Sequence, residues 1–335
     1  MPEAGLIGPR RVGMPVVALG GGHGLSQTLR ALRRLTDDVT AIVGVADDGG
    51  SSGRLRTEFD IVPPGDLRMA LAALCGDDRW GNTWSQVLQH RFGGDGELAG
   101  HAVGNLLITA LWEETGSVVE GLDWVAALLG ANGRVLPVAT VPLSIVASVV
   151  GYDAEHPERV HEVRGQVSVE RGTGRVIDLW VEPPNPQACP EAVAALASAE
   201  VIILGPGSWY TSVLPHLLVP GVRSALAETE ATKLLVLNLD AQHGATEDFH
   251  PHEYLNNLAD RYPEVGIDWV LGDPRYIDDL ELLADACKAL GAGLELSSVA
   301  AEDPSSRVMS ARHDAQLLAA AFGTVFAHGS ISPWQ

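Results

Sequence analysis

Short apolar segments that run into glycine-rich or acidic loops recur along this chain, and this alternation restricts the fold more than any other feature. Val16–Leu19 precedes a loop, residues 20–24, that is almost entirely glycine, and Val39–Ala46 precedes Asp47–Gly53. Leucines recur at helical spacing between the two segments, over Leu25–Leu35. Two strands joined by one helix form a βαβ unit with parallel, buried strands.

The same alternation returns in the second half of the chain. Val201–Leu204 runs into Gly205–Ser208, and Leu234–Leu239 runs into Asp240–Gly244. Trp269–Leu271 has the same character and precedes another glycine and aspartate. We therefore predict an α/β, Rossmann-like fold with a mostly parallel sheet and flanking helices.

The middle of the chain departs from this alternation. Residues 66–129 have mostly helical periodicity, whereas the period shifts towards two between about 135 and 181. Gly172–Gly174 resembles a hairpin turn between Val167–Val169 and Val176–Leu179. We predict a β excursion at about 135–181 inside one domain spanning 15–335, preceded by a flexible tail over residues 1–14.

Composition indicates which ligands the protein can bind and in which cellular compartment it is found. The formal net charge is -21, which argues against nucleic acid and anionic membranes as partners. No apolar run reaches the roughly 18 residues of a membrane span. The three cysteines are far apart, as expected for buried thiols in a reducing compartment, so we expect a cytoplasmic location.

The glycine loops at the predicted strand ends are candidate phosphate sites. Ligands of open α/β sheets bind outside the carboxyl ends of the strands, where glycines allow close approach to a phosphate. The 20–24 loop is neither a dinucleotide fingerprint, because Leu25 stands where the last glycine is required, nor a Walker loop. A tight turn without ligand is the alternative, but a second loop, Gly205–Ser208, makes a diphosphate ligand more credible.

The acidic loop after the second strand offers other chemistry. Asp47 and Asp48 stand where a carboxylate often accepts hydrogen bonds from a ribose, and paired carboxylates also hold Mg²⁺. A turn or cap is the alternative. Arg54, Arg56 and Arg68 suit phosphate, although neighbouring acids also permit surface ion pairs.

Other residue patterns point to no further chemistry. The His250–His252 segment lacks the partners of a zinc site, and Ser208 lacks the flanking pattern of a hydrolase nucleophile. We therefore predict no metal site and no catalytic triad.

Several segments together resemble the gluconeogenesis-factor (YvcK) branch of the CofD-like family. The segments are Ala18–Ser26, Val45–Arg56, Pro63–Arg68, Gly104–Leu107 and Gly205–Ser212. The resemblance extends from about residue 15 to the end of the chain. It implies a CofD-type fold and binding of UDP-sugars, notably UDP-N-acetylglucosamine, with NADP-type nucleotides as further candidate ligands.

The resemblance also implies a set of ligand-binding residues. These are Gly20, Gly21, Gly22, His23, Gly24, Asp47, Asp48, Ser51, Ser52, Arg54, Asp66, Arg68, Asn105, Gly205, Gly207, Ser208, Thr211, Asn238 and Gln242. The sequence departs from the family pattern in two places. His23 replaces a usual threonine, and Ala241 and Ala245 replace the usual threonine and glutamate around Gln242.

Three functional hypotheses follow from the resemblance. The first is a regulatory UDP-sugar binding protein, without catalytic residues or a required cofactor, linked to cell shape and cell-wall synthesis during gluconeogenic growth. The second is a phospholactyl transferase like the sister CofD branch, in which Asp47 and Asp48 hold Mg²⁺. The third is a module that binds protein partners of wall synthesis, with the nucleotide as effector; a homodimer is also compatible.

Overall fold

Seven parallel strands form the central sheet. The structure, a computed structural model, describes residues 13–239, 250–302 and 309–328. From one edge to the other, the strands are β10 (Gly293–Leu296), β9 (Trp269–Gly272), β8 (Thr232–Val236), β7 (Val201–Leu204), β1 (Val16–Gly20), β2 (Val39–Val43) and β3 (Arg134–Pro137). Every neighbouring pair runs parallel, which confirms the predicted α/β fold.

The central strands are buried on both faces. All five residues of β1 are buried, and β1 pairs with β2 on one side and with β7 on the other, so that Val16 lies opposite Val39 and Val201. Continuous apolar segments of this kind form strands whose two faces are both covered by helices.

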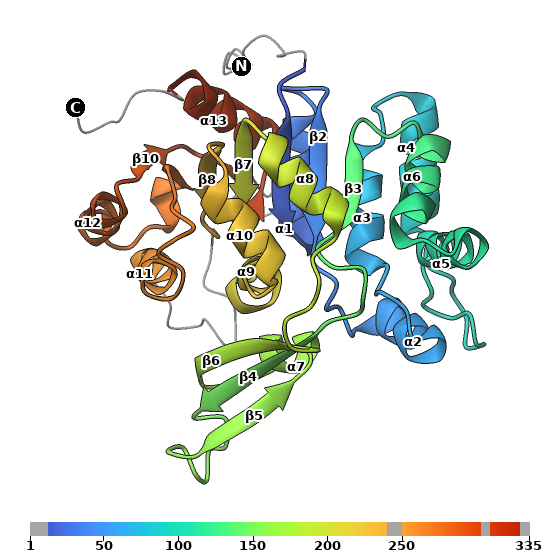
Figure 1. Ribbon diagram of the computed structural model, residues 1–335, viewed down its shortest axis with the longest axis horizontal. Coiled ribbons are helices and arrows are strands. Elements are labelled where there is room, and N and C mark those ends of the chain that lie inside the picture. The colour runs from blue at the N-terminus through green and yellow to red at the C-terminus, as the bar shows by residue number, and fades with distance from the viewer. Residues whose placement is uncertain (1–12, 240–249, 303–308, 329–335) are drawn as a thin grey trace.

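Helices cover both faces and one edge of the sheet (Figure 1). On one face α1, α3 and α13 pack together, and on the other face α8 packs against α10. Beyond β3, the helices α4, α5 and α6 form a separate layer. The helical bounds are α1 (Gly22–Leu32), α2 (Gly50–Phe59), α3 (Gly65–Leu74), α4 (Arg79–Gln89), α5 (Val103–Thr115), α6 (Val118–Leu129), α7 (Gln166–Arg171), α8 (Pro190–Ser198), the π-helix η1 (Trp209–Val213), α9 (Leu214–Leu217), α10 (Pro220–Glu228), α11 (Pro251–Arg261), the 3-10 helix η2 (Pro274–Tyr276), α12 (Leu280–Leu290) and α13 (Ala315–His328).

The β excursion is a separate antiparallel sheet below the carboxyl ends of the main strands (Figure 1). Its order is β5 (Val160–Arg164), β4 (Ser144–Val150) and β6 (Arg175–Glu182). The predicted lower bound was wrong, because Val135 belongs to β3 of the main sheet, where it pairs with Ala41.

The predicted hairpin at 172–174 is also wrong. Val167–Val169 lies on the short helix α7, and β6 pairs with β4 instead. Three alternating residues do not distinguish a strand from one helical turn. The helix begins after Gly165, whose φ of 92° is unfavourable for residues other than glycine. In its first turn, the Val167 N–H donates to the Asp48 side chain.

Some elements at the end of the chain had no clear sequence pattern. These are the edge strand β10 and the hairpin of β11 (Ala300–Glu302) and β12 (Met309–His313). All three cysteines are buried and free, as predicted. Residues 1–12 of the predicted tail lie outside the described residues, and Met14 is buried. Among the helices of the described ranges, none has the length and apolar character needed to cross a bilayer.

Candidate functional site

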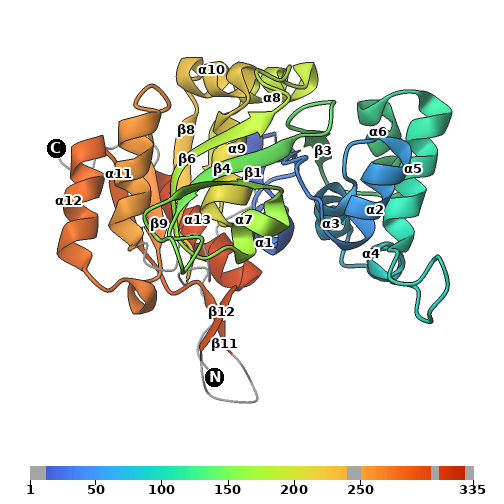
Figure 2. The ribbon, with the colours of Figure 1, turned by 90° about the horizontal axis from the view of Figure 1, so that it is seen from below.

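The strand order reverses between β1 and β7. From β1 the chain proceeds outward to β2 and β3, and from β7 it proceeds outward the other way through β8, β9 and β10. In open parallel sheets, the loops on either side of such a reversal diverge and leave a crevice at the carboxyl ends of the strands. The two loops here are the predicted glycine loops, 20–24 and 205–208, and Figure 2 looks onto this edge of the sheet.

The two glycine loops are in direct contact. A Cβ atom added to Gly24 would lie 2.1 Å from the backbone oxygen of Pro206, closer than any real Cβ contact. The Thr28 hydroxyl donates to the carbonyl oxygen of Gly205 at 3.3 Å, which ties α1 to the second loop. Gly22 and Gly205 have φ values of 59° and 76°, which glycine adopts at little cost.

The first loop leads into the N-terminus of α1, where the Asp66 carboxylate is bound. The Gly22 N–H donates to Asp66, and a Cβ atom on Gly21 would lie 2.4 Å from Asp66 Oδ2. Burial raises the pKa of Asp66, and the nearby Asp47 and Glu170 carboxylates add to this effect. The Gly22 N–H and Arg68 oppose it, and the resulting pKa is about 7. An internal carboxylate thus uses a helix terminus that suits an anion.

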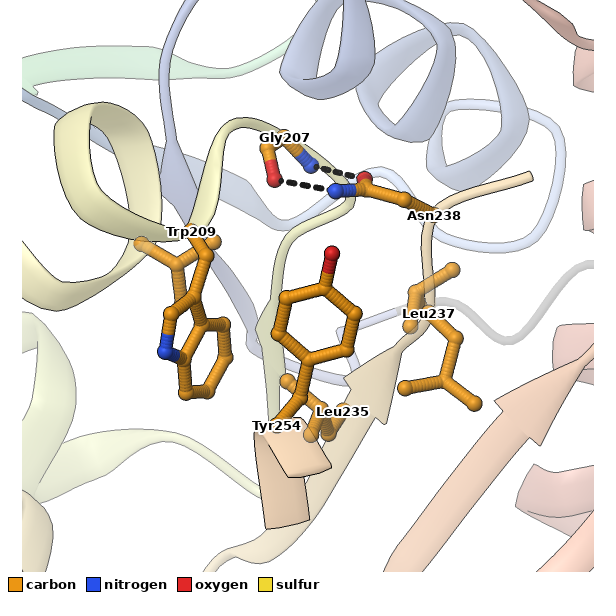
Figure 3. A pocket seen from close by; sticks show the side chains of 8 residues that line it. Gly207, Trp209, Leu235, Leu237, Asn238 and Tyr254 are labelled. Carbon is orange, nitrogen blue, oxygen red and sulfur yellow. Dashed lines mark hydrogen bonds between the residues drawn. The ribbon is translucent and has the colours of Figure 1, made fainter. Parts of the chain in front are cut away.

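The second loop is held by Asn238, as Figure 3 shows. The Gly207 N–H donates to Asn238 Oδ1 at 2.9 Å, and Asn238 Nδ2 donates back to the Gly207 carbonyl oxygen at 2.8 Å. The Tyr254 ring points its hydroxyl towards this pair. The cavity below, of about 10 Å³, is lined by Trp209 and Leu237 among others and has room for about one water molecule.

The second loop continues into η1, which contains Thr211. Ser208 precedes η1, and its carbonyl oxygen accepts from the N–H groups of Ser212 at 2.7 Å and Val213 at 3.0 Å. The hydroxyl of Thr211 donates to Glu170 Oε1 of α7 at 2.5 Å, and Thr211 is buried. Single π-turns are rare and are often found at functional sites.

The two aspartates after β2 point to different partners. Asp47 Oδ1 accepts from the Gly49 N–H at 2.9 Å, and its Oδ2 lies beside Gly65 at the start of α3. Asp48 Oδ1 accepts from the Val167 N–H of α7 at 3.0 Å. Asp47 therefore faces the crevice side of α3, whereas Asp48 binds the β excursion.

Ser51, Ser52 and Asn105 lie together in a buried polar cluster. Asn105 Nδ2 donates to the hydroxyls of Ser51 at 3.0 Å and Ser52 at 3.5 Å, and His101 Nδ1 lies 3.0 Å from Ser51 Oγ. Asn105 Oδ1 is buried without a hydrogen-bond partner among the described residues. Sequence reasoning missed His101, although it stands just before the matched Gly104–Leu107 segment.

The three arginines predicted to suit phosphate differ in their surroundings. Arg56 Nη2 donates to Ser144 Oγ of the β excursion at 2.8 Å. Arg54 is exposed and donates to the carbonyl oxygens of Ala99 at 3.1 Å and Glu97 at 3.3 Å. Arg68 is buried, and its Nη1 donates to Gln89 Oε1. Burial lowers the pKa of Arg68 to about 10. The positive charge of Arg91 also lowers this pKa, whereas the negative charges of Asp66 and Asp47 raise it.

Two further residues were predicted to bind the ligand, His23 and Gln242. His23 is exposed on the first turn of α1, and Gln242 lies outside the described residues. Of the other predicted residues, Asp66 contacts the first glycine loop and Asn238 contacts the second. Asp48 and Arg54 are bound instead to α7 and to the 97–99 backbone.

The residues predicted for Mg²⁺ under the transferase hypothesis do not form a common cation site. Asp47 and Asp48 direct their carboxylates to different helices. Across the described ranges, no three His, Cys, Asp or Glu side chains are placed to hold a metal ion.

The fold and the glycine loops agree with a comparison against known families. The family described as 2-phospho-L-lactate transferase CofD matches residues 16–293. The chain belongs to the CofD family. The match includes both glycine loops, the acidic loop and the β excursion.

Relatives of this chain carry the name gluconeogenesis factor. A Mycobacterium tuberculosis (strain H37Rv) protein, provisionally named a gluconeogenesis factor, is 52% identical over 248 residues, covering 74% of this chain and 72% of the relative. The gluconeogenesis factor of Halalkalibacterium halodurans is 38% identical over 245 residues, covering 73% of each chain. The chain is therefore a CofD family homologue of gluconeogenesis factors.

A solved structure has the same fold. The crystal structure of a UPF0052 family member from Bacillus halodurans, at 2.60 Å resolution, superposes with a TM-score of 0.80 and 33% identity. It covers 92% of this chain and 99% of that protein. The Rossmann-like architecture of the family thus extends over nearly all of the sequence.

Proposed function

We propose that this protein binds a UDP-sugar, UDP-N-acetylglucosamine in the first instance, and acts as a regulatory binding protein without turning the ligand over. The diphosphate would lie across the 20–24 and 205–208 loops, in the crevice where the strand order reverses. The Asp47 carboxylate would accept hydrogen bonds from the ribose hydroxyls. The adjoining Arg68 would favour the negative charge of the phosphates.

One observation carries this proposal. The two glycine loops meet backbone to backbone at Gly24 and Pro206, so one ligand can contact both. The first N–H groups of α1 have no partner inside the helix, and the N-cap residue Gly21 offers no side-chain cap. Such a helix terminus, beside a second glycine loop, suits the two phosphates of a nucleoside diphosphate.

Calorimetric titration tests the proposal most simply. UDP-N-acetylglucosamine and UDP should both release or absorb heat on binding, whereas N-acetylglucosamine alone should bind weakly, because it lacks the diphosphate. Bound ligand should raise the free energy of unfolding by about 2.7 kcal/mol at a hundredfold excess over Kd. Neither heat nor thermal stabilisation with millimolar UDP-N-acetylglucosamine would contradict the proposal.

A CofD-like transferase is the second candidate, and the family match favours it. In that reaction a phospholactyl group is transferred to a deazaflavin precursor with Mg²⁺. The divergent directions of Asp47 and Asp48 weigh against a shared cation site. Incubation with donor, acceptor and Mg²⁺ should therefore give no product. Product formation that is lost in Asp48→Ala would favour the transferase.

The cellular role is proposed on two grounds. The name of the relatives, gluconeogenesis factor, supports a role in growth on gluconeogenic carbon sources. From the family resemblance alone we infer that the protein supports cell shape and wall synthesis during this growth, with protein partners in wall synthesis. Affinity capture with and without UDP-N-acetylglucosamine tests the effector role. Identical partners under both conditions would contradict it.

A further inference from the structure

The short helix α7 lies beside the side of the proposed crevice that the second glycine loop forms. Both views place α7 beneath the carboxyl edge of the main sheet, beside the strands of the β excursion (Figures 1 and 2). It contacts η1, which follows the second glycine loop, and strands β4 and β5 of the β excursion. We call Gln166–Arg171, with Gly165 before it, the α7 strap.

The N-terminal end of the α7 strap is held by the loop after β2. Asp48 Oδ1 accepts from the Val167 N–H at 3.0 Å, and a Cβ atom on Gly165 would lie 2.0 Å from Asp48 Oδ2. A Cβ atom on Gly49 would lie 3.1 Å from Val167 Cγ2. The carboxylate therefore sits closely over the first turn of α7.

The C-terminal end of the α7 strap is held by the loop after β7. Glu170 Oε1 accepts from the Thr211 hydroxyl at 2.5 Å and from Gln166 Nε2 at 3.2 Å. A threonine hydroxyl has one proton to donate. While Thr211 donates to Glu170, it cannot donate to a phosphate oxygen.

Internal acceptors thus take the donors that an anionic ligand needs in both loops. Asp66 accepts from the Gly22 N–H in the first loop, Asn238 accepts from the Gly207 N–H, and Glu170 accepts from Thr211. Two of these three acceptors are carboxylates. A phosphate that enters the crevice competes with them for hydrogen bonds and is repelled by their charge.

We propose that Glu170 is an internal competitor of the ligand, and that an anionic group bound at the second glycine loop takes the Thr211 hydroxyl from Glu170 and releases the α7 strap. This inference rests on the proposed function, because it assigns the ligand phosphates to the same two loops. Loss of the Thr211 bond leaves the bond from the Val167 N–H to Asp48 as the remaining side-chain hydrogen bond between the α7 strap and the main domain among the described residues. Ligand binding is thereby converted into movement of the α7 strap, which a binding partner can detect.

Amide hydrogen exchange of the ligand-free protein tests whether Glu170 stabilises the α7 strap. Glu170→Ala should raise exchange in 166–171 by about tenfold, the ratio expected when one hydrogen bond to a charged group is lost. Glu158→Ala is the matched control, because Glu158 is an exposed carboxylate in the connection between β4 and β5. Unchanged exchange in Glu170→Ala would overturn the inference.

Titration with pyrophosphate and with UDP-N-acetylglucosamine tests the competition. Glu170→Gln keeps an acceptor for Thr211 but removes the charge, so it should bind both ligands about tenfold more tightly than the wild type. Both ligands should raise exchange in the α7 strap of the wild type. Equal affinity of Glu170→Gln and wild type, or protection of the strap by ligand, would overturn the inference.

The two proposals can fail separately. If UDP-N-acetylglucosamine does not bind but pyrophosphate binds and releases the strap, the proposed ligand is wrong and the role of Glu170 stands. If the UDP-sugar binds and the strap becomes protected, the proposed function stands and the competition by Glu170 is wrong.

Discussion

Asp66 shows how a single side chain adjusts to the crevice. Its carboxylate accepts from Gly22 N–H, and burial together with Asp47 and Glu170 raises its pKa from 3.8 to about 7. The folded protein therefore binds more protons than the unfolded chain between these values. The stability that Asp66 contributes is complete below the unfolded pKa and is lost as the pH rises through the folded pKa.

Asp66→Asn should remove this dependence. The amide keeps an acceptor for Gly22 and carries no charge at any pH. Urea unfolding at pH 4.5 and pH 8 should show that the variant gains stability relative to wild type at the higher pH, on the order of 3 kcal/mol. An equal stability difference at both pH values would mean that Asp66 titrates normally.

Asp48 is a structural residue by its contacts. Asp48→Ala removes the acceptor of the Val167 N–H and should lower the free energy of unfolding by about 1 kcal/mol, the usual cost of losing a helix cap. Asp48→Asn should lose less stability, because the amide oxygen can still accept the hydrogen bond from the Val167 N–H. Thermal unfolding and UDP-N-acetylglucosamine affinity should be measured together. Lost affinity with unchanged stability would instead place Asp48 at the ligand.

At the scale of elements, α9 carries a histidine beneath the sheet. Burial lowers the pKa of His216 to about 4, although hydrogen bonds to backbone groups around it act to raise the pKa. Its Nε2 lies 3.2 Å from the Ile42 carbonyl oxygen. The folded state keeps this ring neutral while the unfolded chain takes up a proton. Stability from His216 is thus present above the unfolded pKa of 6.5 and is lost as the pH falls towards 4.

His216→Gln should flatten this part of the pH dependence. Urea unfolding of wild type should show a loss of up to about 1.4 kcal/mol per pH unit from this group as the pH falls below the unfolded pKa. Asp66 acts in the opposite direction over the same range, so the difference between variant and wild type is the quantity to compare. A difference that does not change between pH 7 and pH 5 would contradict burial of a neutral ring.

The contact between the two glycine loops is the second element-scale prediction. Gly24→Ala places a methyl group against the Pro206 backbone oxygen, which cannot move aside as a flexible side chain can. We expect a loss of about 1–3 kcal/mol in stability and weaker UDP-N-acetylglucosamine binding. Gly323→Ala is the control, because a Cβ atom there has nothing within 4 Å. If the folded Gly24→Ala variant binds the ligand with normal affinity, the ligand does not contact these two loops.

Sequence periodicity located the main strands but not α7. The buried strands β1, β2, β7, β8 and β9 were predicted because each is a continuous apolar segment followed by glycine, aspartate or asparagine. The α7 segment was assigned to a strand, because its helical state depends on Asp48, which is 119 positions away from Val167. Short segments that take their structure from a distant side chain carry no local periodicity.

At the scale of the molecule, the glycine loops were predictable as a pair and their contacts were not. Strand ends of a parallel sheet lie at one edge, so 20–24 and 205–208 were expected to be close. The sequence does not reveal that Glu170 accepts from Thr211, or that His101 joins Ser51 and Asn105. These contacts depend on how the β excursion and α5 fold back onto the sheet.

Ligand binding where the strand order reverses is the central claim, and amide hydrogen exchange with and without UDP-N-acetylglucosamine tests it most directly. The ligand should slow exchange in 20–25 and 205–213, the two glycine loops and the first turns that follow them. Exchange in α4 and α6, beyond β3, should not change. Protection confined to α4–α6 or to the β excursion, with the glycine loops unaffected, would contradict the account.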